Sequence, residues 1–480
     1  MPEPAKIRNV AVVGHRGTGK TSLVEAILFQ SGAINRLGAV EAGTTVSDSD
    51  EDEHKRQLSI AMSLEHASWQ ERKLNLLDIP GDPSFQGELR TAARVVEGAL
   101  VTVSGVMGVE VGTSRAWKLA SELGLARVIF VNMLDRERAD FFRTLEQLRS
   151  QLSAQCVAVH IPIGAEHELT GIIDVLHMCA YTSPEGGKEG EPGPIPDDMA
   201  DVVAEYREKL LDAVVETDEG LMERYLEGQE LDAHEVAAAL KAAVTSGDVF
   251  PVACGVATKN LGTHALLDLL VEGVPSPAKK TSSIDIDGAS TAIFVFKTVA
   301  DPFAGRINLF RVLKGTATAE TTLVNLRGKG KERLGSLLEL QGKEHKPALD
   351  FGEGDIGAVA KLKEAQTGDL LVDKEVAIEV PNFGFPEPVM SFAITPKSKG
   401  DEEKVASAIR RLAEEDQTLR LRRDQQTGEE ILSGMSQMHV EVALDRAKHL
   451  NRRRAPRQHP ISRHPPGAQG QEYGQHDIGC

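Results

Sequence analysis

Eight residues near the N-terminus have the types and the spacing of a phosphate-binding loop. Residues 14–21 read Gly-His-Arg-Gly-Thr-Gly-Lys-Thr, which matches GxxxxGK followed by Ser or Thr. In this pattern backbone N–H groups surround the phosphates, Lys20 can reach the β- and γ-phosphates, and the Thr21 hydroxyl can take a Mg²⁺ position. A strand-like run, 9–13, precedes the loop and a helix-like run, 22–29, follows it. We therefore favour phosphate binding over the alternative, an incidental glycine-rich turn.

Two acidic residues, each following an apolar run, indicate a guanine nucleotide. Asp78-Ile-Pro-Gly81 has the DxxG spacing, in which the Asp holds Mg²⁺ through water and the Gly amide faces the γ-phosphate. Asn132-Met-Leu-Asp135 is close to the Asn-Lys-x-Asp pattern. A carboxylate at Asp135 can accept hydrogen bonds from N1 and the exocyclic amine of guanine, which adenine cannot offer. A single Asp at a strand end is often only a turn starter or an N-cap, but three elements in this order favour GTP.

The motifs must be positioned by strands and helices that alternate along the chain. Such alternation up to Val274 predicts an α/β fold with a doubly wound parallel sheet. We assign residues 1–277 to a nucleotide-binding domain with an inserted subdomain at about 160–250. Within the insert we expect a loop over 183–196 and a helix over 210–225.

The pattern changes twice after Pro277. Short β-rich runs separated by glycines predict an antiparallel β-barrel over 285–378. A β-α-β-β-α order over 386–448 predicts a split βαβ, α+β domain that lacks its final strand. Residues 449–480 lose apolar periodicity, so we expect a disordered tail. We interpret it as the end of a truncated or frameshifted product; the alternative is a basic tail that binds RNA phosphates.

The chain resembles elongation factor G, the ribosomal translocase, and in particular a divergent paralogue of it. Beyond the nucleotide motifs, the resemblance is carried by residues 162–166, 171–174, 178–181, 254–260, 301–305, 352–356, 367–369, 385–389 and 432–439. It extends from residue 7 to about residue 448. The resemblance implies GTP or GDP and Mg²⁺ as cofactors, and the ribosome, with its RNA and proteins, as the partner of a cytoplasmic monomer.

The resemblance also implies the site residues. Those implied to contact the nucleotide are Gly14, His15, Arg16, Gly17, Thr18, Gly19, Lys20, Thr21, Asp78, Ile79, Pro80, Gly81, Asn132, Met133, Leu134, Asp135, Gly255, Val256 and Ala257. Those implied to bind Mg²⁺ are Thr21, Ser59 and Asp78.

Four positions depart from the family's pattern. Asp82 stands where the family has a histidine that is believed to orient the attacking water. A carboxylate there adds charge beside the γ-phosphate, so hydrolysis should be slow unless the group is protonated or turned away. Gln57 replaces a glycine before Ser59, Met133 replaces the lysine of the guanine motif, and Val256 replaces a serine. GTP binding is thus a firmer expectation than hydrolysis, for which Asp82 and Lys20 are the candidate catalytic residues.

Composition agrees with a large intracellular protein. The chain has 480 residues, of which 41% are hydrophobic, enough to fill several domains, and its apolar runs are too short for a membrane span. Four separated cysteines indicate reduced thiols in a cytosol. A net charge of −18 argues against a protein that binds naked nucleic acid. We interpret the basic residues at 410–411 and 419–423 as a solvated helix face and an exposed strand, or as RNA contacts. The acidic run 48–53 is typical of a mobile solvated loop.

Two functional classes remain open. The first is a ribosome-associated GTPase that hydrolyses GTP weakly and translocates poorly, because the family's C-terminal domains do not follow. The second is a GTP-dependent binding module without hydrolysis, or a truncated product without function.

Overall fold

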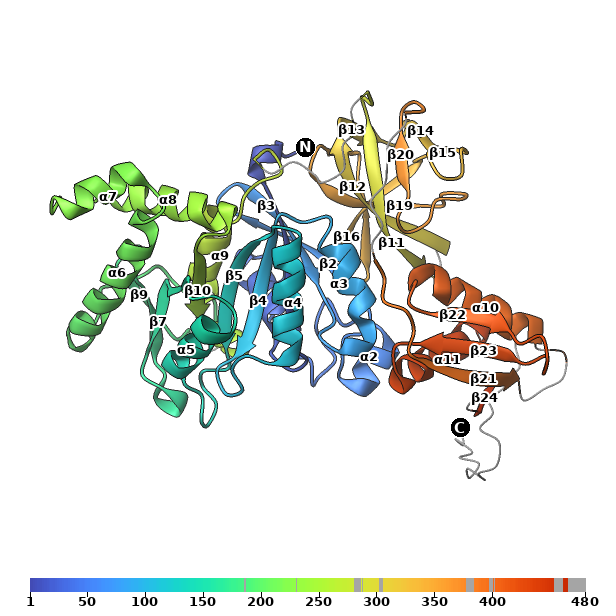
Figure 1. The fold of residues 1–480 in the computed structure, drawn as a ribbon, viewed down its shortest axis with the longest axis horizontal. Helices are drawn as coiled ribbons and strands as arrows, with labels where there is room; N and C mark the ends of the chain where they lie inside the picture. The colour runs from blue at the N-terminus through green and yellow to red at the C-terminus, as the bar shows by residue number, and fades with distance from the viewer. Residues whose placement is uncertain are drawn as a thin grey trace.

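The computed structural model describes residues 1–480 except 185–186, 230, 280–285, 287, 302–304, 377–383, 397–399, 401, 453–460 and 465–480. Three domains follow one another along the chain. A large N-terminal α/β domain is flanked on one side by a β-rich domain and a smaller α+β domain (Figure 1).

A seven-stranded sheet with the order β2-β3-β1-β4-β5-β10-β6 forms the centre of the N-terminal domain. Its neighbouring strands are parallel except for the pair β2–β3, which confirms the predicted doubly wound sheet and adds an antiparallel edge strand. Strands covered on both faces read as continuous apolar runs, and β1, β4 and β5 are buried throughout. The strands are β1 (Ile7–Gly14), β2 (Ser63–Trp69), β3 (Arg72–Asp78), β4 (Gly98–Ser104), β5 (Ala126–Asn132), β6 (Cys156–Ala158) and β10 (Phe250–Cys254).

Helices surround this sheet, and 3₁₀ turns lie in its loops. The α-helices are α1 (Lys20–Ser31), α2 (Glu51–Arg56), α3 (Gln86–Ala92), α4 (Val111–Glu122), α5 (Phe141–Gln151) and α9 (Thr263–Gly273). The 3₁₀ helices of the chain are η1 (Pro4–Lys6), η2 (Pro83–Phe85), η3 (Glu166–Glu168), η4 (Asp197–Met199) and η5 (Ala257–Lys259). In the part of the chain that the structure describes, no helix is both long and apolar enough to cross a bilayer.

The inserted subdomain has a small antiparallel sheet, β7-β8-β9, and three helices. Its elements are β7 (His160–Ile163), β8 (Gly171–Asp174), β9 (Cys179–Thr182), α6 (Ala200–Val215), α7 (Glu219–Leu226) and α8 (Ala233–Ser246). The expectation of one helix over 210–225 is wrong. Asp218 has an extended backbone and accepts hydrogen bonds from the N–H groups of Gly220 and Leu221, so it separates the two helices and caps the second.

The second domain is the predicted antiparallel β-barrel. Eight strands pair in the order β15-β14-β20-β11-β12-β19-β16-β17, and β13 pairs with β18. The strands are β11 (Ala292–Asp301), β12 (Gly305–Lys314), β13 (Thr316–Thr318), β14 (Thr322–Asn325), β15 (Lys331–Arg333), β16 (Ser336–Gln341), β17 (Glu344–Pro347), β18 (Asp350–Gly352), β19 (Ile356–Ala360) and β20 (Leu370–Val372).

The third domain corrects one sequence-based expectation. Its elements are β21 (Met390–Pro396), α10 (Glu402–Glu415), β22 (Arg420–Arg423), β23 (Glu430–Gly434), α11 (Gln437–Arg452) and β24 (Ile461–His464). The predicted absence of a final strand is wrong, because β24 pairs with the free edge of β21 and completes the order β22-β23-β21-β24. The expected disorder over 449–480 lies largely outside the described residues. Arg410, Arg411 and the edge strand β22 lie on the surface, as predicted.

One hydrophobic core extends from the N-terminal domain into the barrel, which also has a core cluster of its own. Side chains of the central sheet and of the barrel, such as Phe294 and Phe296, belong to a single buried cluster. Buried charges also cross the boundary: Arg311 pairs with Glu97, and Lys297 pairs with Glu88. Cys156, Cys179 and Cys254 are free thiols, and Cys480 is outside the described residues.

Candidate nucleotide-binding site

The loop 14–21 turns sharply between β1 and α1. Gly14 has φ +151°, and a Cβ there would lie 2.3 Å from the carbonyl oxygen of Thr102 on the neighbouring strand β4. Gly19 caps α1 in the left-handed region with φ +83°, and a Cβ there would lie 2.3 Å from Nδ2 of Asn132. Both positions therefore require glycine, and the loop presents the N-terminus of α1 to any bound anion.

The two ends of the loop tip are held by side chains. His15 accepts a hydrogen bond at Nδ1 from the N–H of Gly112 (3.1 Å), and its Nε2 lies 3.4 Å from Oε1 of Glu110. The buried Thr18 donates its hydroxyl to the carbonyl oxygen of His15 (3.0 Å). Arg16 and Gly17 lie between these anchors and are exposed. The backbone of the tip is therefore held in place by the His15 and Thr18 side chains, while Arg16 is exposed.

The Asp78–Gly81 turn lies directly against this loop. A Cβ on Gly81 would lie 2.4 Å from Nζ of Lys20 and 2.7 Å from the backbone nitrogen of Arg16. Lys20 is buried and donates to the carbonyl oxygen of His15 at 2.9 Å. Burial lowers the pKa of Lys20, whereas the nearby Asp78 acts in the opposite direction. The DxxG turn and the phosphate-loop lysine thus meet at one point.

The three residues assigned to Mg²⁺ come from three separate segments. Oγ1 of Thr21 lies 3.1 Å from Oγ of Ser59, and Asp78 ends β3 beside them. Among the described residues, neither carboxylate oxygen of Asp78 has a hydrogen-bond partner, and the buried hydroxyls of Thr45 and Ser47 also lack one. Buried oxygens without partners are costly, and hard oxygen donors are what Mg²⁺ prefers.

These residues therefore fit a magnesium ion. Thr21 and Ser59 would hold it by their hydroxyls and Asp78 through water, and the ion would neutralise phosphate charge there. Burial raises the pKa of Asp78 to about 6, although Thr21 and Lys20 oppose the shift. The pKa of Asp48 is also raised to about 6, mainly by burial and secondarily by the charge of Asp78.

Asn132 joins the phosphate loop to the base-binding loop. Its Nδ2 donates to the carbonyl oxygen of Thr18 (3.0 Å), and its Oδ1 accepts from the N–H of Ala257 (3.0 Å). Both contacts are buried. In the same loop, Gly255 donates its N–H to Val131, and Val256 pairs with Leu261 across a short bridge. One amide side chain thus fixes the spacing between the phosphate end and the base end of the site.

Asp135 has a partner that the motif analysis missed. Its Oδ2 accepts from Nζ of Lys259 at 2.9 Å, so a lysine from η5 stands beside the carboxylate that would contact guanine. Met133 has φ +64°, and its Cε lies 3.3 Å from the position of a Cβ on Gly19. Met133 therefore packs on the phosphate loop, and Leu134 is buried. Lys259 lies in the base-loop run 254–260, which gave the only sequence signal for its role.

Asp82 directs its two oxygens to two different groups. Oδ1 accepts from the N–H of Ser84 (2.9 Å) and caps η2, whereas Oδ2 lies 3.4 Å from Nη1 of Arg16. The carboxylate is therefore held by a backbone amide and by a cation of the phosphate loop.

The acidic run 48–53 forms part of an ordered turn and helix, so the expectation of a mobile solvated loop is wrong. Asp50 and Glu53 make a capping box around the start of α2. The buried Glu53 accepts hydrogen bonds from the N–H groups of Ser49, Asp50 and Ile60, each at 3.0 Å. The Asp-x-x-Glu spacing was the signal that could have predicted this helix start.

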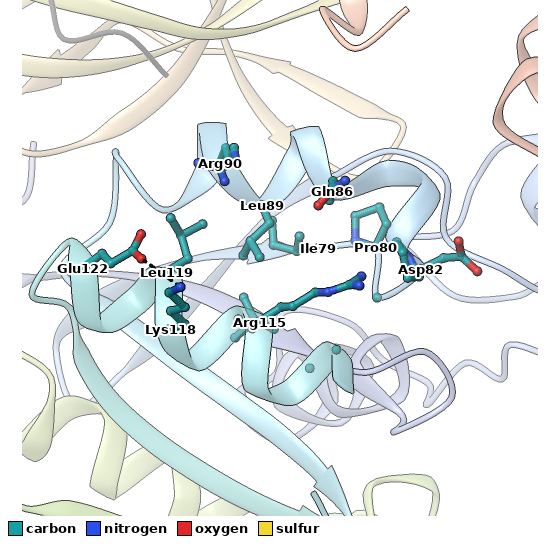
Figure 2. Close-up of a pocket in the computed structure, with 16 residues that line it drawn as sticks. Ile79, Pro80, Asp82, Gln86, Leu89, Arg90, Arg115, Lys118, Leu119 and Glu122 are labelled. Atoms are coloured by element: carbon teal, nitrogen blue, oxygen red, sulfur yellow. Dashed lines mark ion pairs between the residues drawn. The ribbon is translucent and has the colours of Figure 1, made fainter. Parts of the chain in front are cut away.

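A cavity of about 270 Å³ adjoins the phosphate end of the site. It lies between α3 and α4, and Figure 2 shows Leu89 and Leu119 facing one another across it. Arg115 extends along the cavity toward Pro80, and the carboxylate of Asp82 points away from its centre. Ile79, Pro80 and Gly81 form the end wall. The DxxG turn is therefore bounded by the phosphate loop on one side and by a mainly apolar space on the other.

Comparisons with known proteins agree with this arrangement. Residues 5–276 match the family described as Elongation factor Tu GTP binding domain. Residues 290–374 match Elongation factor G domain 2, and residues 385–451 match Elongation Factor G, domain III. The chain is also similar to a protein of Thermus thermophilus whose crystal structure is known, with 34% identity and a TM-score of 0.87 over 96% of this chain and 67% of that chain. The chain therefore belongs to the elongation factor G-like family of GTP-binding translation factors.

Proposed function

We propose that this protein is a ribosome-associated GTPase that binds Mg²⁺ and GTP tightly and hydrolyses GTP slowly on its own. The observation that carries the proposal is the double contact of Asn132, which joins the phosphate loop to the base loop next to Asp135. A site spaced in this way suits a guanine nucleotide with its phosphates on Lys20 and its base on Asp135. The protein would act as a cytoplasmic monomer.

Asp82 supports slow intrinsic hydrolysis. A carboxylate is a poor substitute for a neutral imidazole beside a γ-phosphate, because it adds like charge where charge accumulates in the transition state. In this chain the carboxylate of Asp82 accepts a hydrogen bond from the N–H of Ser84 and forms an ion pair with Arg16. These contacts lessen the charge penalty expected from the sequence, but they also hold the carboxylate on other partners, so the attacking water lacks a well-placed acceptor and hydrolysis stays slow.

The decisive experiment is single-turnover GTP hydrolysis, measured with and without ribosomes. We expect a low rate for the free protein, a higher rate with ribosomes, and a further rise of at least about tenfold in Asp82→His, since a positioned histidine usually contributes more than that. Asp82→Asn is the matched control because it removes the charge without supplying an imidazole. A rate that responds neither to ribosomes nor to Asp82→His would contradict the proposal.

The second candidate is a GTP-dependent binding module that does not hydrolyse GTP. The pairing of Asp82 with Arg16 favours it, because neither group is then free to orient water. In this case ribosome binding would depend on GTP, yet the bound GTP would remain intact over a complete single-turnover time course.

A further inference from the structure

We propose that Arg16 is a positioning cation that neutralises Asp82 and, when GTP is bound, shares its guanidinium with the γ-phosphate, so that this pair makes the site prefer GTP over GDP. The inference rests on the proposed function, because it requires a guanine nucleotide in this site. It starts from the contact between Arg16, in the phosphate loop, and Asp82, which directly follows the DxxG turn.

The geometry places Arg16 at the γ-phosphate end of the site. Its backbone nitrogen lies 2.7 Å from the position of a Cβ on Gly81, the residue whose amide faces the γ-phosphate in a DxxG turn. The base end is defined by Asp135 and Lys259, which come from other loops. Arg16 therefore stands where a third phosphate would be added to a diphosphate, and GDP would not reach it.

The two side chains of this ion pair differ in how exposed they are and in how firmly they are held. The side chain of Asp82 is 9% exposed and is held by the N–H of Ser84, whereas the side chain of Arg16 is 54% exposed. If a γ-phosphate bound beside this pair, the Arg16 guanidinium would therefore move and the Asp82 carboxylate would stay in place. A guanidinium has five N–H donors in a fork, so it can contact a carboxylate and a phosphate oxygen together.

Removal of the Arg16 charge should affect GTP more than GDP. Without Arg16, the γ-phosphate would approach the negative charge of Asp82 with Lys20 as the remaining cation of the loop. Like charges in close contact are unfavourable, and a partly exposed pair changes an affinity by about tenfold or less. GDP lacks the group that is repelled. Loss of Arg16 should therefore weaken the binding of GTP and have little effect on the binding of GDP.

The test compares GTP and GDP dissociation constants, measured with magnesium by fluorescence of labelled nucleotides on the full chain. We expect Arg16→Ala to weaken GTP binding about three- to fivefold and GDP binding by less than about twofold. Arg16→Ala combined with Asp82→Asn should recover part of the lost GTP-to-GDP ratio, because the repelling charge is gone although the contact of Arg16 with the γ-phosphate is not replaced. Arg16→Lys should give an intermediate ratio, since it keeps the charge and loses the fork.

A matched control is Arg333→Ala in the barrel. That side chain is 62% exposed and pairs with Glu320, so the substitution removes a similar surface ion pair in another domain. It should leave both affinities unchanged. Equal weakening of GTP and GDP in Arg16→Ala, or no recovery in the double variant, would overturn the inference. If the unmodified protein bound neither nucleotide, the proposed function itself would fail.

Discussion

Single residues of this site show what a motif can and cannot predict. Spacing alone predicts the glycines, Lys20 and Asp78 as site residues, because the shape of a bound phosphate dictates their types. The pairings of Arg16 with Asp82 and of Lys259 with Asp135 were not predicted. Each joins loops that are distant in the sequence, so it depends on the completed sheet and not on a local pattern.

Asn132 gives a prediction about affinity. Asn132→Ala removes one donor and one acceptor and leaves the buried carbonyl of Thr18 and the buried N–H of Ala257 without this partner. Two buried unpaired groups at about 1–3 kcal/mol each cost about 2–6 kcal/mol, and we expect part of this cost to appear as weaker GTP binding, because the two loops lose their fixed spacing. Calorimetric titration would measure it. Asn132→Asp keeps the acceptor for Ala257 and should lose about half as much; an unchanged affinity in Asn132→Ala would contradict this role.

Asp78 gives a prediction about pH. Its pKa in the folded protein is raised from 3.8 to about 6 by burial, so the folded state holds a proton more tightly than the unfolded chain. Stability should therefore fall as pH rises from about 4 to about 6. Asp78→Asn should raise the free energy of unfolding at pH 7 by about 2–3 kcal/mol, with little effect at pH 4.

The same substitution should abolish magnesium-dependent GTP affinity, because the amide cannot replace the carboxylate charge. Urea unfolding at the two pH values and GTP titration with and without magnesium would measure both effects. A variant that is less stable at pH 7, or that binds GTP with full magnesium dependence, would count against this account of Asp78.

At the scale of elements, regular periodicity was predicted well and short elements were predicted poorly. The first helix of the β-α-β-β-α order expected over 386–448 is α10 (Glu402–Glu415), and the parallel sheet is present. The break between α6 and α7, the short helix α2 and the four-residue strand β24 were missed. Each of these features depends on one capping side chain or on pairing with a partner strand. In such short elements these contacts decide the structure more than the intrinsic helix or strand propensity does.

Segment 47–62 gives a prediction about local opening. Glu53 accepts three backbone N–H groups at 3.0 Å and so holds the two ends of α2 against the rest of the segment. Glu53→Ala should increase hydrogen exchange over this segment by about tenfold or more, because its amides lose their acceptor. Mass spectrometry of deuterated peptides would detect it. Glu51→Ala changes an exposed residue of the same helix and should leave exchange unaltered.

At the scale of the whole molecule, the third domain packs on the two segments of the N-terminal domain that adjoin the phosphate end. Leu58 and Ile60 of one segment and Phe85 of the other form a small buried cluster with Val442 of α11. Arg56 pairs with Asp445 of the same helix at 2.9 Å. The domain order was predictable from changes of composition along the chain, but these contacts were not, because they join residues hundreds of positions apart.

The boundary between the first two domains gives a prediction about stability. Glu97→Ala would leave Arg311 buried and without its carboxylate. Breaking a buried pair in this way typically costs about 3–5 kcal/mol, so the midpoint of urea unfolding should fall clearly. Glu320→Ala, which removes the partner of an exposed arginine in the barrel, should cost less than about 1 kcal/mol. Similar losses in both variants would contradict the importance of burial here.

The continuous apolar core beneath the nucleotide domain and the barrel also limits modular exchange. A barrel transplanted from a relative would place new side chains where Phe294 and Phe296 join this core, and mismatched volumes there lead to voids or overpacking. Chimaeras joined between these two domains should therefore be insoluble unless the side chains on both sides of the domain boundary are exchanged together.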